Sequence, residues 1–208
     1  MRNPEVTKET ILKESAILFN TQGYKATSLS NITDATGLTK GAIYRHFTSK
    51  DVLEIQTLEH LSVLMNEQLR DRIKKQPTAG KKLRTIFHFF KSYISDPPFE
   101  GGCPLLNAAV EADDAHPQLR MAALAILNGL RASVGSIIEK GIYYKQLKKG
   151  IDKEMYITLI IASLEGAIMM SKLQGNDDDL KRIVKHLEKQ ISEIEIWFFL
   201  KNEIPTGI

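Results

Sequence analysis

The stretch from residue 27 to residue 50 reads Thr-Ser-Leu-Ser-Asn-Ile-Thr-Asp-Ala-Thr-Gly-Leu-Thr-Lys-Gly-Ala-Ile-Tyr-Arg-His-Phe-Thr-Ser-Lys, and it decides the fold. Apolar side chains recur at every third position in its first part, which predicts a short helix capped by the hydroxyl of Thr27 or Ser28. Gly37 ends that helix, because glycine adopts a left-handed backbone conformation without steric cost. A tight, rigid turn is therefore expected after it.

A second short helix follows the turn, with Thr39 as its cap. Ile43 and Phe47 are four residues apart and are expected to face inward. The polar and basic residues between them then remain on the outer surface; they are Lys40, Gly41, Tyr44, Arg45 and His46. A helix of this size fits the major groove of DNA, and its first turn is the part that meets base edges. The pattern predicts a helix-turn-helix that reads DNA.

Helical spacing continues through almost every long segment, and no segment alternates in the manner of a strand. We therefore expect an all-α protein of about nine helices. Besides the two described, these run from about Glu5 to Thr21, from after Thr48 through Ile73, across Leu83 to Ile94, from Cys103-Pro104, from near Pro117 toward Tyr143, from Lys153 to Leu173 and from Asp177 to Lys201.

The 208 residues suffice for two domains, and charge supports dividing them at residue 50. Residues 1–50 hold seven Lys and Arg against four Asp and Glu, whereas the other 158 residues hold 21 of each. The whole positive excess thus lies in the segment expected to approach phosphates. We expect a helix-turn-helix domain over 1–50 and a helical effector-binding and dimerisation domain over 51–208.

Three features of the sequence limit the location and class of the protein. A single cysteine excludes an internal disulfide, and the N-terminus lacks the apolar core of a signal peptide. The longest apolar stretch, from Tyr156 to Met170, is interrupted by Glu165 and is short for a bilayer span. A cytoplasmic protein is therefore expected.

Residues 5–53 resemble the DNA-binding domain of the tetracycline-repressor (TetR) family. The likeness rests on Gly-Leu-Thr-Lys-Gly at 37–41, on Tyr44 with Phe47, and on Ser-Lys before a long fourth helix. The resemblance implies a one-component transcriptional regulator, in most members a repressor, that binds a palindromic operator as a homodimer. It also implies DNA contacts at Thr27, Ser28, Thr39, Lys40, Gly41, Tyr44, Arg45, His46 and Lys50.

The segment Gly-Gly-Cys103-Pro-Leu-Leu-Asn107 is similar to a subgroup of this family that has Gly-Cys at the start of helix six. Some members of that subgroup use the cysteine as a chemical sensor. A helix N-terminus stabilises a thiolate and raises its reactivity. The simpler interpretation, a small buried hydrophobe, stays open beside it.

The last two expected helices carry long apolar stripes. They comprise Ile157, Ile160, Ile161, Leu164 and Ile168 on one helix and Ile183, Leu187, Ile191, Ile194 and Phe198 on the other. In the TetR family the equivalent helices form a four-helix dimer interface, which these stripes would fit. The alternative is that a monomer buries them internally.

An effector pocket is expected among the helices after residue 50, where apolar and polar-tipped side chains mix. The candidates are Leu61, Met65, Phe87, Phe90, Tyr93, Cys103, Asn107, Leu127, Leu130, Ile168 and Met169. Dry core packing is the alternative for each. The set has no strong charge cluster, which favours a neutral or weakly polar effector, a class that includes aromatic molecules.

Other functions receive less support from the sequence. Glu111, Asp113, Asp114 and His116 could ligate a metal, but they fit a solvated helix end more simply. No phosphate loop, metal-ligand spacing or serine elbow indicates an enzyme or a cofactor. A DNA-binding protein without ligand control is the nearest alternative, and a helical scaffold is a more distant one.

Overall fold

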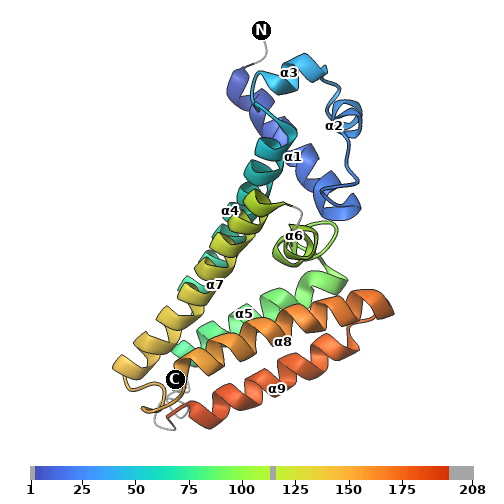
Figure 1. The fold of residues 1–208 in the computed structure, drawn as a ribbon. Helices are drawn as coiled ribbons and strands as arrows, with labels where there is room; N and C mark the ends of the chain where they lie inside the picture. The colour runs from blue at the N-terminus through green and yellow to red at the C-terminus, as the bar shows by residue number, and fades with distance from the viewer. Residues whose placement is uncertain (1–2, 113–115, 197–208) are drawn as a thin grey trace, which may run out of the picture. The chain divides into compact units, whose positions relative to one another are not determined.

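The structure is a computed structural model that describes residues 3–112 and 116–196. This described part contains nine α-helices and no named strand, so the all-α prediction is confirmed (Figure 1). In chain order they are α1 (Pro4–Gln22), α2 (Leu29–Thr36), α3 (Lys40–Tyr44), α4 (Lys50–Lys74), α5 (Ala79–Ser95), α6 (Pro104–Ala112), α7 (Pro117–Tyr143), α8 (Lys153–Gln174) and α9 (Asp178–Ile194).

The chain divides into two compact units, each made of two separate pieces of sequence. The first unit combines Met1–Glu67 with Asp96–Asn128, and the second combines Gln68–Ser95 with Gly129–Ile208. Helices α4 and α7 each contribute residues to both units. The units therefore do not coincide with a division at residue 50, and that domain boundary stays a prediction.

Local capping explains the helices at the start of the first unit. The Ser28 hydroxyl accepts from the Asn31 amide at 3.2 Å, and the Asn31 side chain accepts from the Ser28 amide at 2.8 Å, which forms a reciprocal cap at α2. Gly37 follows α2 with φ 65°, and Thr39 then caps α3 through the Ala42 amide at 3.2 Å. The expected helix-turn-helix is present.

The core of the first unit joins the helix-turn-helix to the first turns of α4. Ile32 of α2 and Ile43 of α3 are buried, as are Phe19 at the end of α1 and Leu53 in α4. The ring of Tyr24 stacks on Phe19 with 5.1 Å between centroids. Burying these large side chains stabilises the arrangement by roughly 2 kcal/mol each.

The second unit is built on α5, α8 and α9, which run alongside one another (Figure 1). Arg84 of α5 donates to both carboxylate oxygens of Glu195 at 2.9 and 2.7 Å. Beyond Ile194 the backbone is extended, and the Ile196 amide donates to the carbonyl of Gln146 at 3.0 Å. The last helix was expected to continue to Lys201, but it ends at Ile194, so this prediction is wrong. Lys201 itself lies outside the described residues.

The apolar stripes of α8 and α9 form the core of the single chain. Ile157, Ile160, Leu164 and Ile168 are at most 3% exposed, and Leu187 and Ile191 are 1% exposed. Ile161 and Ile183 are half-buried, and Phe198 lies outside the described residues. The interpretation of these stripes as a dimer surface is thus corrected: α5, α8 and α9 bury most of them against one another.

Helices α7 and α8 are long and apolar enough, by length and composition alone, to cross a membrane. The stretch from Tyr156 to Met170, which is short for a span, is part of the longer helix α8. Core helices of water-soluble proteins meet the same criterion, so the observation is weak evidence for a membrane location.

Candidate functional site

The outer face of α3 is polar and open. Thr39 holds the start of the helix, while Ile43 is 1% exposed and anchors the opposite face in the core. Tyr44 is 50% exposed, and Lys40 and Gly41 are exposed as well. The structure thus brings a cation, a phenol and a bare backbone position together on one surface. Arg45 is exposed beside them, and His46 is half-buried.

Two residues before α2 that were expected at the same surface behave differently. Ser28 is exposed and caps α2. Thr27 is fully buried, and its hydroxyl donates to the carbonyl of Gly23 at 2.7 Å. A side chain held in this way has no free group to offer a phosphate, so a DNA contact by Thr27 does not fit this geometry.

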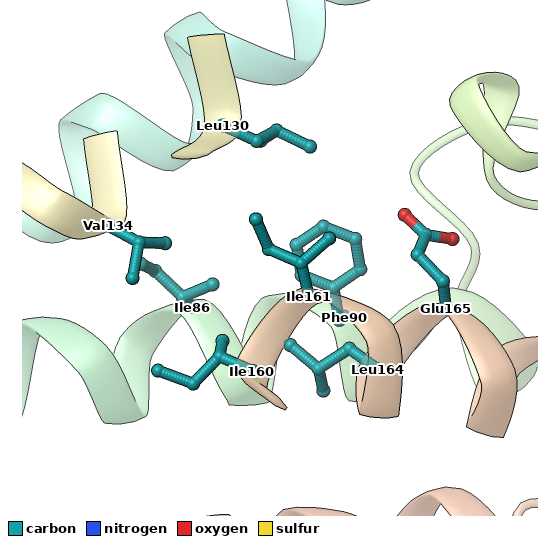
Figure 2. Close-up of a pocket in the computed structure, with 8 residues that line it drawn as sticks. All are labelled: Ile86, Phe90, Leu130, Val134, Ile160, Ile161, Leu164 and Glu165. Carbon is teal, nitrogen blue, oxygen red and sulfur yellow. The ribbon is translucent and has the colours of Figure 1, made fainter. Parts of the chain in front are cut away.

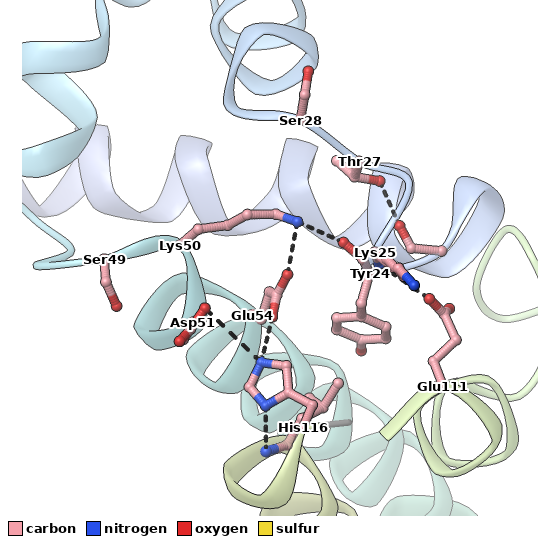
Figure 3. Close-up of polar contacts among 12 residues, drawn as sticks. Tyr24, Lys25, Thr27, Ser28, Ser49, Lys50, Asp51, Glu54, Glu111 and His116 are labelled. Carbon is pink, nitrogen blue, oxygen red and sulfur yellow. Dashed lines mark hydrogen bonds and ion pairs between the residues drawn. The ribbon is translucent and has the colours of Figure 1, made fainter. Parts of the chain in front are cut away.

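Lys50, at the start of α4, is held inside the first unit. Its ammonium donates to the carbonyl of Tyr24 at 2.7 Å and lies 3.0 Å from the Glu54 carboxylate (Figure 3). The side chain is 30% exposed. A phosphate contact by Lys50 stays a prediction, and it would have to share an ammonium that already has two protein partners.

Glu54 is the buried charge of this region, with 3% of its surface exposed. Its second carboxylate oxygen lies 2.8 Å from Nε2 of His116 (Figure 3). Nδ1 of His116 accepts from the Leu119 amide at 3.2 Å, in the first turn of α7. Because an amide only donates, Nδ1 carries no proton, and this assigns the proton to Nε2, which donates to Glu54.

Asp51, Glu54 and His116 could hold a metal by proximity, since one ligand atom of each lies within 4.8 Å of the others. A metal would need the lone pair of Nε2, yet the hydrogen-bond network places a proton there. The Lys50 ammonium beside Glu54 adds repulsion. The arrangement therefore favours a Lys50–Glu54 ion pair with His116 as a neutral donor over a metal centre.

Two members of the metal set considered from the sequence, Glu111 and His116, are described, and each has protein partners of its own. The carboxylate of Glu111 accepts from the Lys25 amide at 3.1 Å, which commits it to the α1–α2 connection (Figure 3). Asp113 and Asp114 lie outside the described residues.

A pocket in the second unit lies among α5, α7 and α8 (Figure 2). Its wall is apolar except for one carboxylate; the lining residues are Ile86, Phe90, Leu130, Val134, Ile160, Ile161, Leu164 and Glu165. The cavity that they enclose measures about 20 Å³, which is room for a water-sized group. The wall is chemically suited to a small apolar molecule with a single polar group directed at Glu165, but the lining side chains would have to move apart to admit it.

Sequence reasoning named two of these pocket residues, Phe90 and Leu130. Little in the sequence indicated the other apolar lining residues, because an isoleucine on a buried stripe has the same sequence pattern whether it packs in the core or lines a pocket. Glu165 carried a clearer signal: it is the one charge between Tyr156 and Met170. A single charged residue within an apolar helix is a signal for a ligand-binding position, because burying a charge there is costly unless it has a function or a partner.

The remaining expected effector residues have varied surroundings. Phe87, Tyr93 and Ile168 belong to the buried core of the second unit, and Met169 is 47% exposed. In the first unit, Leu61 is buried and lines a separate groove with Lys13, His60 and Phe99. Met65 and Cys103 are buried, and Leu127 and Asn107 are half-buried. Their role in effector binding stays a prediction.

Cys103 precedes the first residue of α6 and is 1% exposed. Its carbonyl accepts from the Asn107 amide at 3.1 Å. The position at a helix N-terminus was expected from the sequence. Burial of the thiol limits its access to oxidants and electrophiles.

Comparisons with known proteins agree with this architecture over most of the chain. Residues 11–54 match the family described as "Bacterial regulatory proteins, tetR family", and residues 79–187 match "Tetracyclin repressor-like, C-terminal domain". The second match alone covers more than half of the 208 residues. The chain belongs to the TetR family. Its membership of the Gly-Cys subgroup stays a prediction.

Solved and curated relatives of this TetR-family protein extend the comparison. A TetR transcriptional regulator from Chloroflexus aurantiacus J-10-FL is 32% identical, with TM-score 0.89 and coverage of 94% of this chain and 98% of its own. The HTH-type transcriptional repressor DhaR of a Mycobacterium species is 21% identical over 85% of this chain and 88% of its own.

A further structure shows a relative with DNA. The TetR-family regulator CifR, in a cysteine mutant complexed with 26-base-pair operator DNA, is 21% identical, with TM-score 0.79 and coverage of 87% of this chain and 94% of its own. At that identity the likeness shows the fold. As a TetR-family member, the chain is a helix-turn-helix transcriptional regulator of a class that binds operator DNA.

Proposed function

We propose that this TetR-family regulator is a one-component repressor in the cytoplasm that binds a palindromic operator as a homodimer and is released by a small-molecule effector. The observation that carries the proposal is the exposed polar face of α3, with Lys40 and Tyr44 outward and Ile43 anchored inward. The relative named as a repressor and the relative complexed with operator DNA support it.

Operator binding is tested by selecting bound duplexes from a random library with the full-length protein. Two recognition helices in successive major grooves lie about 34 Å apart. We therefore expect the enriched DNA to contain an inverted repeat with half-sites one helical turn, or a whole number of turns, apart. Enrichment of no sequence, or of an unpaired half-site by a monomer, contradicts the proposal.

The homodimer is supported by the side of α8 that the core leaves uncovered. Ala162 and Met169 are exposed and Gly166 is half-buried, while Leu173 is 83% exposed. These four positions are spaced by four, three and four residues and so lie on one face. A Cβ on Gly166 would meet nothing within 4 Å, so close approach of a second helix is possible there.

The effector is proposed to occupy the pocket among α5, α7 and α8. Its apolar wall supports a small, largely apolar effector, and Glu165 supports one polar group on it. A thermal-shift screen of small molecules, followed by operator release, tests this. Ile161→Phe should fill the pocket and abolish the shift while operator binding persists. Ile183→Phe on α9, half-buried and outside the pocket, is the matched control.

A reversible effector fits the geometry better than an electrophile, because Cys103 as a residue is only 1% exposed. If operator release by an electrophile is abolished in Cys103→Ser, the covalent route replaces the reversible one. If no small molecule shifts the melting temperature or releases DNA, the chain is a DNA-binding protein without ligand control.

A further inference from the structure

The connection between α1 and α2 sets the direction of the helix-turn-helix. α1 ends at Gln22, and Ser28 caps α2 six residues later. The α1–α2 junction is defined here as residues 20–28. Whatever fixes this junction also fixes α2, and α2 carries α3 through the rigid turn at Gly37.

Asn107 of α6 binds the first residue of the junction. Its amide nitrogen donates to the carbonyl of Asn20 at 3.1 Å and to the side-chain oxygen of Asn20 at 2.9 Å. It also lies 3.1 Å from the carbonyl of Gly101. The Asn20 amide in turn donates to the carbonyls of Gly102, at 3.0 Å, and Glu100. Every partner of the Asn107 amide nitrogen named here is an oxygen acceptor.

Close approach of the loop before α6 makes this contact specific. Gly101 has φ 91°, and a Cβ there would collide with the backbone of Asn20. Only glycine permits both the backbone angle and the approach. The end of α1 therefore lies directly on the loop that opens α6.

Glu111 binds the other part of the junction. It follows Asn107 by four residues, so both side chains lie on one face of α6. Its carboxylate accepts from the Lys25 amide at 3.1 Å (Figure 3). A Cβ on Gly23 would come within 2.8 Å of the same carboxylate, so the junction backbone lies against it.

We propose that Asn107 and Glu111 are positioning residues for operator recognition: from one face of α6 they hold the α1–α2 junction, and thereby α3, in the conformation that enters the groove. The inference rests on the operator binding proposed above. It assigns to α6, which lies more than 50 residues after the helix-turn-helix, a direct part in the affinity for DNA.

Isosteric and conservative variants test the proposal in the full-length protein. Asn107→Asp replaces the donor with a carboxylate that faces three oxygens, and we expect operator affinity to fall at least tenfold, on the order of the loss of a buried hydrogen bond with an unsatisfied acceptor left behind. Glu111→Ala should lose about fivefold. Glu111→Gln keeps an oxygen acceptor for the Lys25 amide and should restore affinity to near the wild-type value.

Hydrogen exchange supplies a readout that does not depend on DNA. In Asn107→Asp and Glu111→Ala, the amides of residues 23–28 should exchange faster, while those of the α5, α8 and α9 core keep their protection. Asn66→Asp is the matched control, because Asn66 is exposed on α4 of the same unit and should change neither readout.

The outcomes separate this inference from the proposed function. If the wild-type protein selects no operator, the proposed function fails, and exchange at residues 23–28 still decides whether α6 holds the junction. If the wild type binds an operator and Asn107→Asp and Glu111→Ala bind it equally well, with unchanged exchange, the positioning role is wrong. Should Asn107→Asp fail to fold, the pair Glu111→Ala and Glu111→Gln decides the question.

Discussion

Nε2 of His116 lies 2.8 Å from the carboxylate of Glu54, and this contact joins the residue just before α7 to the N-terminal part of α4. The imidazole acts with both nitrogens, because Nδ1 accepts from the Leu119 amide. Glu54 thus receives a neutral donor on one oxygen and the Lys50 ammonium on the other. A buried carboxylate with two donors stabilises the unit only while both remain in place.

Removal of the Glu54 carboxylate should therefore be costly. In Glu54→Ala, the Lys50 ammonium and the proton on His116 Nε2 lose a common acceptor, and we expect the free energy of unfolding to fall by about 3 kcal/mol. Urea unfolding measures this change. Glu59→Ala, at an exposed position of the same helix, should alter stability by less than about 0.5 kcal/mol. Equal effects of the two variants would contradict the structural role of Glu54.

Tyr24 should make the protein sensitive to alkali. Burial, and next the charges of Glu111 and Glu54, raise the pKa of the phenol above its ordinary value of 10.0. The unfolded chain then ionises at lower pH than the folded one, so the stability linked to Tyr24 is fully present below pH 10 and is lost as pH rises above it.

Tyr24→Phe tests this linkage. It removes a buried hydroxyl that has no hydrogen-bond partner among the described residues. We expect about 1 kcal/mol more stability at pH 7 and a shallower decline above pH 10. Unfolding free energies measured from pH 7 to pH 11 test both the gain in stability and the shallower decline. If the variant loses stability above pH 10 as steeply as the wild type, Tyr24 is not the source of the alkaline sensitivity.

Lys40→Ala with Tyr44→Ala should abolish operator binding and leave the circular dichroism spectrum unchanged, because both side chains leave the core untouched. Lys40→Ala alone should reduce the slope of log affinity against log salt by about 2 for a dimer, one phosphate contact in each half. Lys185→Ala, exposed on α9, is the control. An unaltered gel shift in the double variant would disprove the assignment of α3.

Gly166→Arg should convert the proposed dimer into a stable monomer. The monomer has open space at this position, and any residue other than glycine or proline favours the helix, so folding should be unimpaired. A second α8 in close contact would be blocked. Analytical sedimentation measures the molecular mass of the variant. Operator affinity should also fall, because a monomer contacts a single half-site. Gly129→Arg on α7, with equally open surroundings, is the control. Retention of the dimer by Gly166→Arg would place the interface elsewhere.

Cys103 should react slowly with thiol reagents. The residue is 1% exposed, so labelling by a disulfide reagent requires an opening of the fold. We expect a rate at least 100-fold below that of the urea-unfolded chain, on the order of the local stability of a core segment. If the folded protein is labelled almost as fast as the urea-unfolded chain, the thiol is accessible and direct sensing by Cys103 becomes the better interpretation.

Sequence signals of short range anticipated most of the helical architecture. Ser28, Gly37 and Thr39 act within a few residues of themselves, through caps and a left-handed stop, so their effect is readable without tertiary context. The start of α4 was placed almost as well: Thr48 was expected to open it, and Ser49 does so through the Val52 amide at 3.1 Å.

Contacts of long range were beyond the reach of periodicity. Asn20 and Asn107 are 87 residues apart, and Glu54 and His116 are 62 apart, so no local pattern pairs them. The stripe on α8 was recognised as apolar, but periodicity does not reveal whether a second copy or the chain itself covers it. The end of α9 was missed for the same reason, since pairing with Gln146 fixes it.

The division of the chain into interrupted units bears on the engineering of hybrid regulators. The unit that contains α2 and α3 also contains residues 96–128, with Asn107, Glu111 and His116. A chimera made by fusing residues 1–50 to a foreign effector domain would leave the α1–α2 junction without Asn107 and Glu111, and would leave Lys50 without Glu54. If the proposed positioning role of α6 holds, a hybrid that keeps the operator specificity of this protein needs α6 and the start of α7 together with the N-terminal helices.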